Sequence, residues 1–172
     1  IYYDPDLTKM MRMLQKYPNG IMLHAPSIRG IRHRALQNSM HELFVQESSV
    51  RNQSADMFRN YRSNIQQCKL YVDILREQFK GKSVYLIAAG PSLDKNLIQL
   101  KQKPENAITM AVGTTYRKLM QLGIRPDCVV FLDAAARMYV QATGYEHENI
   151  PYLMACTACR KIAADYHGPK YL

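Results

Sequence analysis

The most constraining feature of the sequence is the stretch Ser83–Leu93, where an apolar run meets a tight turn and then helix-compatible sequence. The run Val84–Ala88 is rich in branched residues, as buried strands are, and it breaks at Gly90 and Pro91. Polar side chains at the head of the next segment indicate a helix start. Strand, turn and helix in this order form the first half of a β-α-β unit. Backbone N–H groups at such a turn face solvent at the positive end of a helix dipole, which suits a phosphate.

The alternation of strand and helix patterns continues to the end of the chain. Short connections between such elements predict a parallel sheet with right-handed crossovers. Strands that are apolar on both faces should also be covered on both sides. The predicted fold is therefore α/β, a Rossmann-like parallel sheet over residues 82–172. After the first unit, strands are expected at Ala107–Val112, Cys128–Asp133, Tyr152–Cys156 and Lys170–Leu172, with helices at Leu93–Lys101, Thr114–Leu122, Ala135–Thr143 and Cys159–Tyr166.

Residues 1–81 are predicted to form a mainly helical segment that precedes the sheet. Helices are expected at Leu7–Lys16, Ile31–Gln46 and Ala55–Phe79, with a polar break at Glu47–Ser54. Gly81 is placed to end the last helix as a left-handed cap residue, so the domain boundary falls at 80–82. Apolar positions recur at three- and four-residue spacing in the last helix, which is typical of a packing face: Phe58, Tyr61, Ile65, Cys68, Val72, Leu75 and Phe79.

The two ends of the sequence suggest a piece of a longer protein. The chain starts at Ile1 rather than at a methionine, and its last residues, Lys170–Leu172, look like the beginning of a strand. We therefore expect a fragment whose sheet is truncated at the C-terminus.

The charge balance favours anionic partners. The 172 residues include 23 Lys plus Arg against 14 Asp plus Glu, a formal net charge of +9. Nucleotides and nucleic acids both fit such a chain, and so does a solvated basic face with no ligand. Aromatic and basic residues are not interleaved as in proteins that stack single-stranded bases, which argues against nucleic acid.

The composition also bears on the compartment. No run of ~18 apolar residues exists, so no membrane span is predicted. The four cysteines are too few for a disulfide framework in a chain of this length, and a reducing cytoplasm is the simpler expectation.

The turn Ala88–Leu93 resembles the G-x-G-P-S-L turn of the Maf-type flagellin glycosyltransferases, whose domain the MptE-like pterin diphosphokinases share. A similar G-P-S-L turn occurs in bacterial sialyltransferases that use CMP-sugars. The likeness runs from about Lys82 to the end of the chain. It departs from the family at Ala88, where a first Gly is usual, and at Ala134, where Pro is common. The further matches, in order, are Val112-Gly113-Thr114, Gly123-Ile124-Arg125-Pro126-Asp127 and Asp133.

The resemblance implies a nucleotide-dependent transferase. A Maf-like enzyme would move a nonulosonic-acid-type sugar from a CMP-linked donor onto Ser or Thr of flagellin. An MptE-like diphosphokinase would instead use ATP and Mg²⁺ on a hydroxymethylpterin. The N-terminal helices favour the Maf type, because the pterin enzymes are more compact. A non-catalytic binding or scaffold module is a third interpretation, since no clear acid–base pair is visible.

Candidate nucleotide-binding residues lie at the expected ends of the first two strands. Ligands of open α/β sheets bind beyond the carboxyl ends of the strands. The first turn offers Gly90, Pro91 and Ser92, and the second offers Gly113 and Thr114. Gly113 would permit close approach of a ligand. Ser92 can bond a ligand, or Ser92 or Asp94 can cap the helix that follows. Thr114 or Thr115 can bond a ligand, or this turn can simply cap the next helix, and the sequence leaves these roles open.

Asp133 is the candidate catalytic residue, because it ends an apolar strand at the same edge. It can orient a divalent cation, bind a sugar hydroxyl or act as a general base, and its alternative role is to cap the next helix. Asp127 precedes that strand, away from the expected site, and is assigned to a turn or cap. The Cys156–Cys159 pair cannot complete a zinc site by itself, so no metal site is predicted.

Overall fold

The computed structural model describes residues 12, 15, 16 and 28–172, and the chain divides into two compact units, 1–52 and 53–172. The predicted helix at Leu7–Lys16 lies mostly outside the described residues, and the remaining sequence before Ile28 lies outside them too. In the first unit Ile28 is buried, and the Gln37 side chain donates a hydrogen bond to the Arg29 carbonyl at 3.0 Å. Residues 53–81, which were predicted to belong to the N-terminal segment, share a compact unit with the sheet.

Helix α3 spans Arg34–Gln67 without interruption, so the predicted break at Glu47–Ser54 is wrong. That stretch is polar but contains neither glycine nor proline, the two residues that would stop a helix. The helix also ends earlier than predicted. A short 3₁₀ helix, η1 (Val72–Leu75), and a single turn, α4 (Arg76–Phe79), follow it. Gly81 then adopts a positive φ of 74°, as expected of a left-handed cap.

The apolar stripe predicted along the end of this helix is largely exposed. Phe58 is 63% exposed, and Tyr61 and Ile65 are exposed as well, whereas Cys68 and Leu75 are buried. The residues that α3 buries in the second unit are instead two asparagines, Asn60 and Asn64.

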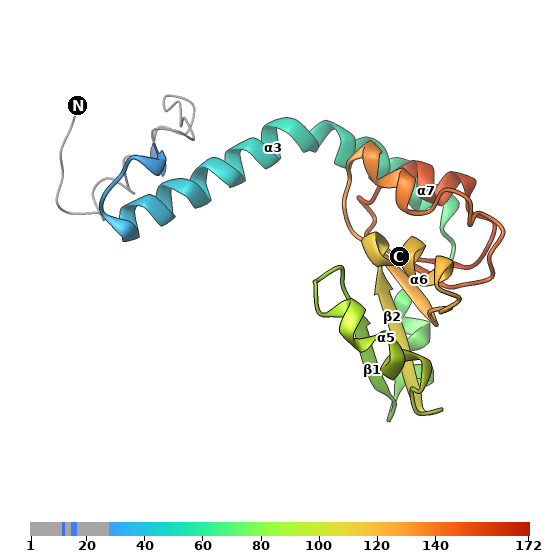
Figure 1. Cartoon of the computed structure of the whole chain (residues 1–172). Coiled ribbons are helices and arrows are strands. Elements are labelled where there is room, and N and C mark those ends of the chain that lie inside the picture. The colour runs from blue at the N-terminus through green and yellow to red at the C-terminus, as the bar shows by residue number, and fades with distance from the viewer. Residues whose placement is uncertain (1–11, 13–14, 17–27) are drawn as a thin grey trace. The chain divides into compact units, whose positions relative to one another are not determined.

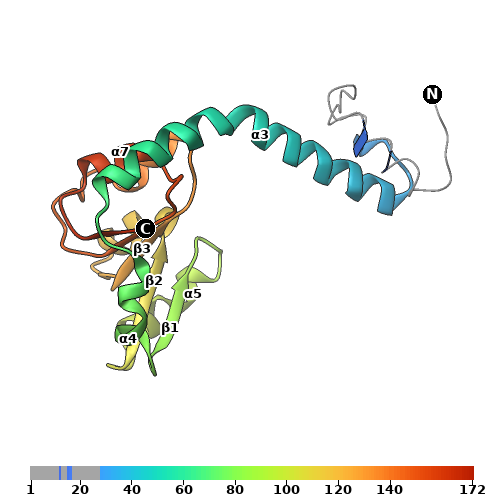
Figure 2. The same cartoon turned by 180° about the vertical axis from the view of Figure 1, so that it is seen from behind.

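The second unit contains a five-stranded parallel sheet in the consecutive order β1-β2-β3-β4-β5, which confirms the predicted Rossmann-like α/β fold (Figures 1 and 2). Ranges predicted for α5 and β2 match the structure residue for residue, and the other elements are shorter or shifted by a residue or two. The strands are β1 Ser83–Ile87, β2 Ala107–Val112, β3 Cys128–Phe131, β4 Tyr152–Met154 and β5 Lys170–Tyr171, joined by α5 Leu93–Lys101, α6 Gly113–Gln121, the 3₁₀ helix η2 Ala136–Gln141 and α7 Arg160–Asp165.

One face of this sheet carries the core. Ile87, Ala111, Val129 and Tyr152 are register partners on neighbouring strands, and all four are buried. They pack with side chains of α5, α6 and α7. Because each strand pairs with the next in sequence and the crossovers turn in one sense, the connecting segments all fall on the same face.

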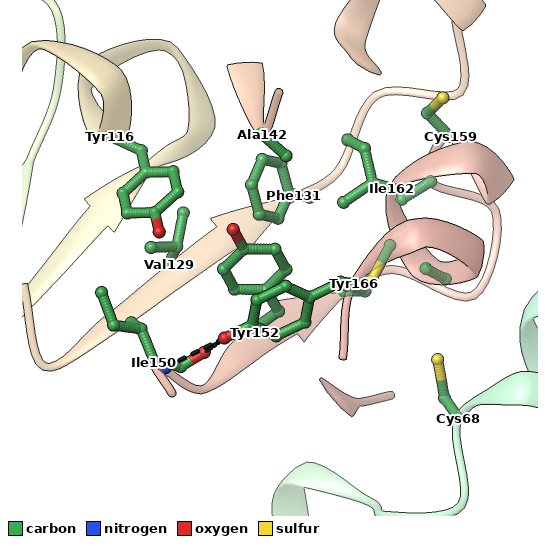
Figure 3. Close-up of a cluster of buried hydrophobic side chains, with 13 residues drawn as sticks. Cys68, Tyr116, Val129, Phe131, Ala142, Ile150, Tyr152, Cys159, Ile162 and Tyr166 are labelled. Carbon is green, nitrogen blue, oxygen red and sulfur yellow. Dashed lines mark hydrogen bonds between the residues drawn. The ribbon is translucent and has the colours of Figure 1, made fainter. Parts of the chain in front are cut away.

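Tyrosines dominate the larger part of that core (Figure 3). The rings of Tyr152 and Tyr166 are stacked, with centroids 3.6 Å apart, and Tyr116 meets Tyr152 edge-on at 5.8 Å. The Tyr166 hydroxyl accepts a hydrogen bond from the Ile150 N–H at 2.9 Å. Burial raises the pKa of Tyr166 to about 12 and that of Tyr116 above its ordinary value, so both rings stay neutral at physiological pH.

The opposite face of the sheet is covered only in part. Leu75 and Phe79, from η1 and α4, line a common cavity with Ile108 and Cys128 near the amino ends of the strands. Farther along, Leu86 is 66% exposed and Leu132 is 67% exposed. Among the described residues, one face is therefore covered as expected, whereas the other is covered only near the amino ends of the strands. Among the described helices, none combines the length and the apolar character that a membrane crossing needs.

Asp127 organises the amino-terminal edge of the sheet, in the structural role the sequence assigned to it. Its Oδ2 accepts hydrogen bonds from the Thr109 N–H and hydroxyl and from Lys103 Nζ, each at 2.7 Å. Burial alone would raise the pKa of Asp127, but these donors outweigh burial and hold the pKa below its ordinary 3.8. The charged carboxylate therefore stabilises the fold.

We predict that Asp127→Asn lowers the free energy of unfolding by about 1 kcal/mol at pH 7, since the half-exposed ion pair is weakened by water. A folded-state pKa below the unfolded one means that the contribution is complete above the unfolded pKa and is lost as pH falls through the folded pKa. The free energies of unfolding of the two proteins, measured by urea titration, should therefore converge as the pH falls through the folded-state pKa of Asp127. Asp73→Asn, at an exposed site in η1, is the control. An equal gap between Asp127→Asn and wild type at pH 7 and in acid would contradict this assignment.

Candidate functional site

The turn after β1 is closed by backbone and leaves its polar side chain unused. The Leu93 N–H donates to the Gly90 carbonyl at 3.0 Å, with Pro91 at the second position of the turn, where its fixed φ is favourable. Ser92 is exposed and already helical in backbone conformation, and its side chain makes no capping hydrogen bond to α5. Asp94, the other candidate cap, pairs with Lys118 of α6 at 2.5 Å. The Ser92 hydroxyl is thus available to a ligand.

Two threonines follow β2, and they have different environments. Thr115 is buried, and its hydroxyl lies 3.0 Å from the Ile87 carbonyl and 2.8 Å from that of Val112. It therefore ties the carboxyl ends of β1 and β2 to the start of α6. Thr114 is exposed and lines a pocket. Of the two, Thr114 is the one that faces a potential ligand.

Glycine is needed at position 113 because neighbouring side chains leave no room for a Cβ, and not because a ligand must come close. A Cβ built at this position would lie 2.1 Å from Gln141 Oε1 and 2.7 Å from Cε1 of Phe131. Gly90 differs, because a Cβ there would meet only the Ser92 hydroxyl oxygen, at 3.8 Å. Gly113 was predicted to permit close approach of a ligand, but the space beside it is filled by the Gln141 and Phe131 side chains. The space around Gly90 is open.

Asp133 lies just beyond the end of β3, and its backbone and side chain are both anchored. Its Oδ1 accepts a hydrogen bond from the Ala135 N–H at 2.9 Å, an Asx-type turn just before η2. Because the N-cap of η2 is Ala135 and receives no side-chain capping bond, the predicted alternative role of Asp133 as a helix cap is not found. Its carbonyl accepts the Cys159 N–H at 2.9 Å. Oδ2 has no hydrogen-bond partner in the part of the chain that the structure describes. One carboxylate oxygen fixes the turn, and the other remains available for chemistry.

A pocket of about 190 Å³ lies at the carboxyl ends of β2 and β3. The candidate residues that follow these two strands come together there. Three of the predicted site residues line the pocket: Gly113, Thr114 and Asp133. Gly90, Pro91 and Ser92 are not among its lining residues; they follow β1, the neighbouring strand at the same edge of the sheet. The remaining walls are mostly apolar: Val112, Val130, Phe131, Leu132, Met138, Gln141 and Ile162.

Among the lining residues that were not predicted, Met138 and Gln141 come from the connection between β3 and β4. Both lie in η2, and the Gln141 amide contacts the Met138 sulfur at 3.1 Å. No motif marks either residue, and η2 was predicted only as a short helix. Their role follows from the β3–β4 connection passing over the strand ends, which local sequence patterns do not encode.

The cysteines and histidines that the structure describes add no recognisable metal-binding group to the site. The described residues include no group of three His, Cys, Asp or Glu side chains placed to hold a metal ion. All four cysteines are free thiols. Cys156 is half-buried, whereas Cys159 is buried with its thiol 3.9 Å from the Ala136 carbonyl.

We predict that Gly113→Ala lowers the free energy of unfolding by about 1–3 kcal/mol, because the buried Phe131 ring cannot move away from the added methyl group. Gly90→Ala is the matched control, since its methyl group enters open space and should leave the melting temperature near wild type. Thermal denaturation of the two variants side by side tests both statements. Equal stability of the two variants would show that the packing at Gly113 has no energetic weight.

The sequence model of a family described as 6-hydroxymethylpterin diphosphokinase MptE-like matches residues 56–172. Among solved structures, a Maf glycosyltransferase from Magnetospirillum magneticum AMB-1 is similar, with a TM-score of 0.51 and 16% sequence identity. That match covers 79% of this chain and 23% of the Maf chain, so the present chain spans about a quarter of its neighbour's length. No curated protein matches the sequence. The family model covers the whole sheet, the candidate pocket and the end of α3, and the chain therefore belongs to the MptE-like family.

Proposed function

We propose that the chain carries the nucleotide site of a Maf-like glycosyltransferase, which moves a nonulosonic-acid-type sugar from a CMP-linked donor to Ser or Thr of flagellin. The observation that supports this most is the gathering of Gly113, Thr114 and Asp133 around one pocket at the carboxyl edge of the sheet. Ligands of α/β sheets bind at this edge. The likeness of the fold to a Maf glycosyltransferase and the four free thiols, which suit a reducing cytoplasm, agree with the proposal.

The phosphate of the donor is assigned to the turn after β1 and to arginines in η2 and α7, the elements that follow β3 and β4. Ser92 contributes a free hydroxyl at the start of the nine-residue helix α5. Arg137 in η2 and Arg160 at the start of α7 are exposed, and neither has an acidic partner within the described part of the chain. Guanidinium groups bind phosphate through paired N–H donors. Both arginines belong to elements that begin just after β3 and β4, so they follow the carboxyl ends of the strands.

Asp133 is assigned the proton transfer. As the acceptor hydroxyl attacks the sugar, its oxygen forms the new bond to the anomeric carbon and the bond from that carbon to the phosphate oxygen breaks. The hydroxyl proton passes to the unengaged Oδ2 of Asp133, and CMP leaves with the bonding electrons. In the alternative role, Asp133 orients a divalent cation toward the phosphate.

The family description favours a second candidate, a diphosphokinase that uses ATP and Mg²⁺ on 6-hydroxymethylpterin. The same edge of the sheet would then hold a triphosphate, and Asp133 would orient the cation. The two candidates differ in their nucleotide, and this difference makes them separable.

Isothermal titration of the chain with CMP, and separately with ATP and Mg²⁺, tests the proposal. We expect heat of binding with CMP. Binding of ATP with Mg²⁺ but not CMP would replace the first candidate by the second. Binding of neither would leave a non-catalytic module that presents the sheet to a partner.

We predict that Ser92→Ala weakens CMP binding by about 1–2 kcal/mol, or ~5- to 30-fold in Kd, through loss of one charge-assisted hydrogen bond. Because Ser92 does not cap α5, the melting temperature should not change. Ser83→Ala, at the opposite end of β1, is the control for both measurements. If Ser92→Ala bound CMP with normal affinity but was less stable, Ser92 would have only a structural role.

We predict that Asp133→Asn reduces transferase turnover in the full-length enzyme by ~100-fold or more, the scale for losing one positioned proton acceptor. The asparagine retains the Oδ1 that accepts the Ala135 N–H, so the fold should be preserved. Partial recovery with added divalent cation would assign Asp133 to metal orientation instead. Asp73→Asn serves as the control carboxylate, and wild-type turnover in Asp133→Asn would refute both chemical roles.

A further inference from the structure

Two asparagines on consecutive turns of α3 form a buried polar contact that the proposed function does not use. Asn60 is 5% exposed and Asn64 is fully buried, and both belong to the second compact unit. In Figures 1 and 2 the C-terminal end of α3 lies beside α7. Four residues apart on a helix, the two side chains point in the same direction.

Each amide group donates both of its hydrogens to backbone carbonyls of the loops that follow β3 and β4. Asn60 Nδ2 lies 2.9 Å from the Ala134 carbonyl and 3.1 Å from that of Thr157. Asn64 Nδ2 lies 3.0 Å from the Cys156 carbonyl and 2.8 Å from that of Ala158. An asparagine amide has two N–H donors, so both donors of each side chain are used.

The loop that Asn60 holds is the one that carries Asp133. Ala134 is the next residue in the chain, and its carbonyl is fixed by Asn60. The carbonyl of Asp133 itself is fixed by the N–H of Cys159, at the end of the loop that both asparagines hold. The backbone around Asp133 is therefore bound on two sides, and both connections lead to α3.

Packing alone does not account for amide side chains at these two positions. An apolar residue of similar size would fill the space but would leave four carbonyls without these donors. Asn64 Oδ1 is itself buried without a hydrogen-bond partner among the described residues. Its desolvation therefore costs free energy, which the two hydrogen bonds donated by the same side chain must offset. The matched region of the family begins at residue 56, one turn before Asn60.

We propose that Asn60 and Asn64 are positioning residues for the candidate site: α3 holds the Asp133–Ala134 and Cys156–Cys159 loops in the geometry that ligand binding requires. Neither amide contacts the pocket. Their effect on a ligand passes through the loop backbone. The choice of CMP as the probe rests on the proposed function, whereas the effect on the loops does not.

The test compares Asn60→Ala with Asn52→Ala, an exposed asparagine of the same helix, in the whole chain. Hydrogen exchange is measured at the amides of Ala135 and Cys159, which bond to Asp133, and at β1 and β2 as an internal reference. We expect Asn60→Ala to speed exchange at Ala135 and Cys159 by ~10-fold or more, with β1 and β2 unchanged. We expect CMP affinity to fall by ~10-fold or more, the scale for lost buried hydrogen bonds to a positioning group. Asn52→Ala should alter neither quantity.

Asn60→Ser keeps one donor in a smaller side chain, and it should give intermediate values for exchange and for affinity. Unchanged exchange at Ala135 and Cys159 in Asn60→Ala would overturn the proposal. Faster exchange with unchanged CMP affinity would overturn it as well, and would reduce the asparagines to structural contacts. If the wild-type chain binds no CMP, the proposed function fails, and the exchange measurements alone then decide whether the asparagines position Asp133.

Discussion

Parallel pairing of each strand with its sequence neighbour is the constraint on which the rest of the structure depends. Right-handed crossovers repeated in one direction place every connecting segment on the same face of the sheet. The main core, built around Val129, Tyr152 and Tyr166, is one-sided for this reason. The same geometry brings the carboxyl ends of neighbouring strands to one edge, so residues more than twenty positions apart in sequence line one pocket.

The carboxyl edge of the sheet is shaped by the neighbouring helices and loops as well as by the strands. In a doubly wound sheet a crevice opens where the strand order reverses, but the order of the five described strands does not reverse. Here η2 and α7 supply the walls, with Gln141 and Ile162 facing the strand ends. Helix α3 reaches the same loops through Asn60 and Asn64. The site thus combines strand ends, their following loops and a helix from before the sheet.

Sequence patterns predicted what depends on local order and missed what depends on tertiary contacts. Apolar runs and turns located all five strands, and Gly113, Thr114 and Asp133 line one pocket. The buried side of the end of α3 was predicted wrongly because the prediction relied on the apolar stripe. Tertiary contacts instead bury Asn60 and Asn64, on another side of the helix. Gln141 escaped notice because nothing in its neighbours marks it. The role of Gly113 needed the position of Phe131, which no sequence window contains.

The tyrosine core gives the chain a built-in spectroscopic reporter. The sequence has no tryptophan, so its near-ultraviolet absorption and emission come chiefly from twelve tyrosines. Tyr152 contacts both Tyr116 and Tyr166, and all three side chains are buried. Rings packed in a fixed asymmetric arrangement dominate near-ultraviolet circular dichroism. That signal therefore reports on packing between β3, β4, α6 and α7, and it would follow loosening of this core separately from changes in helix content.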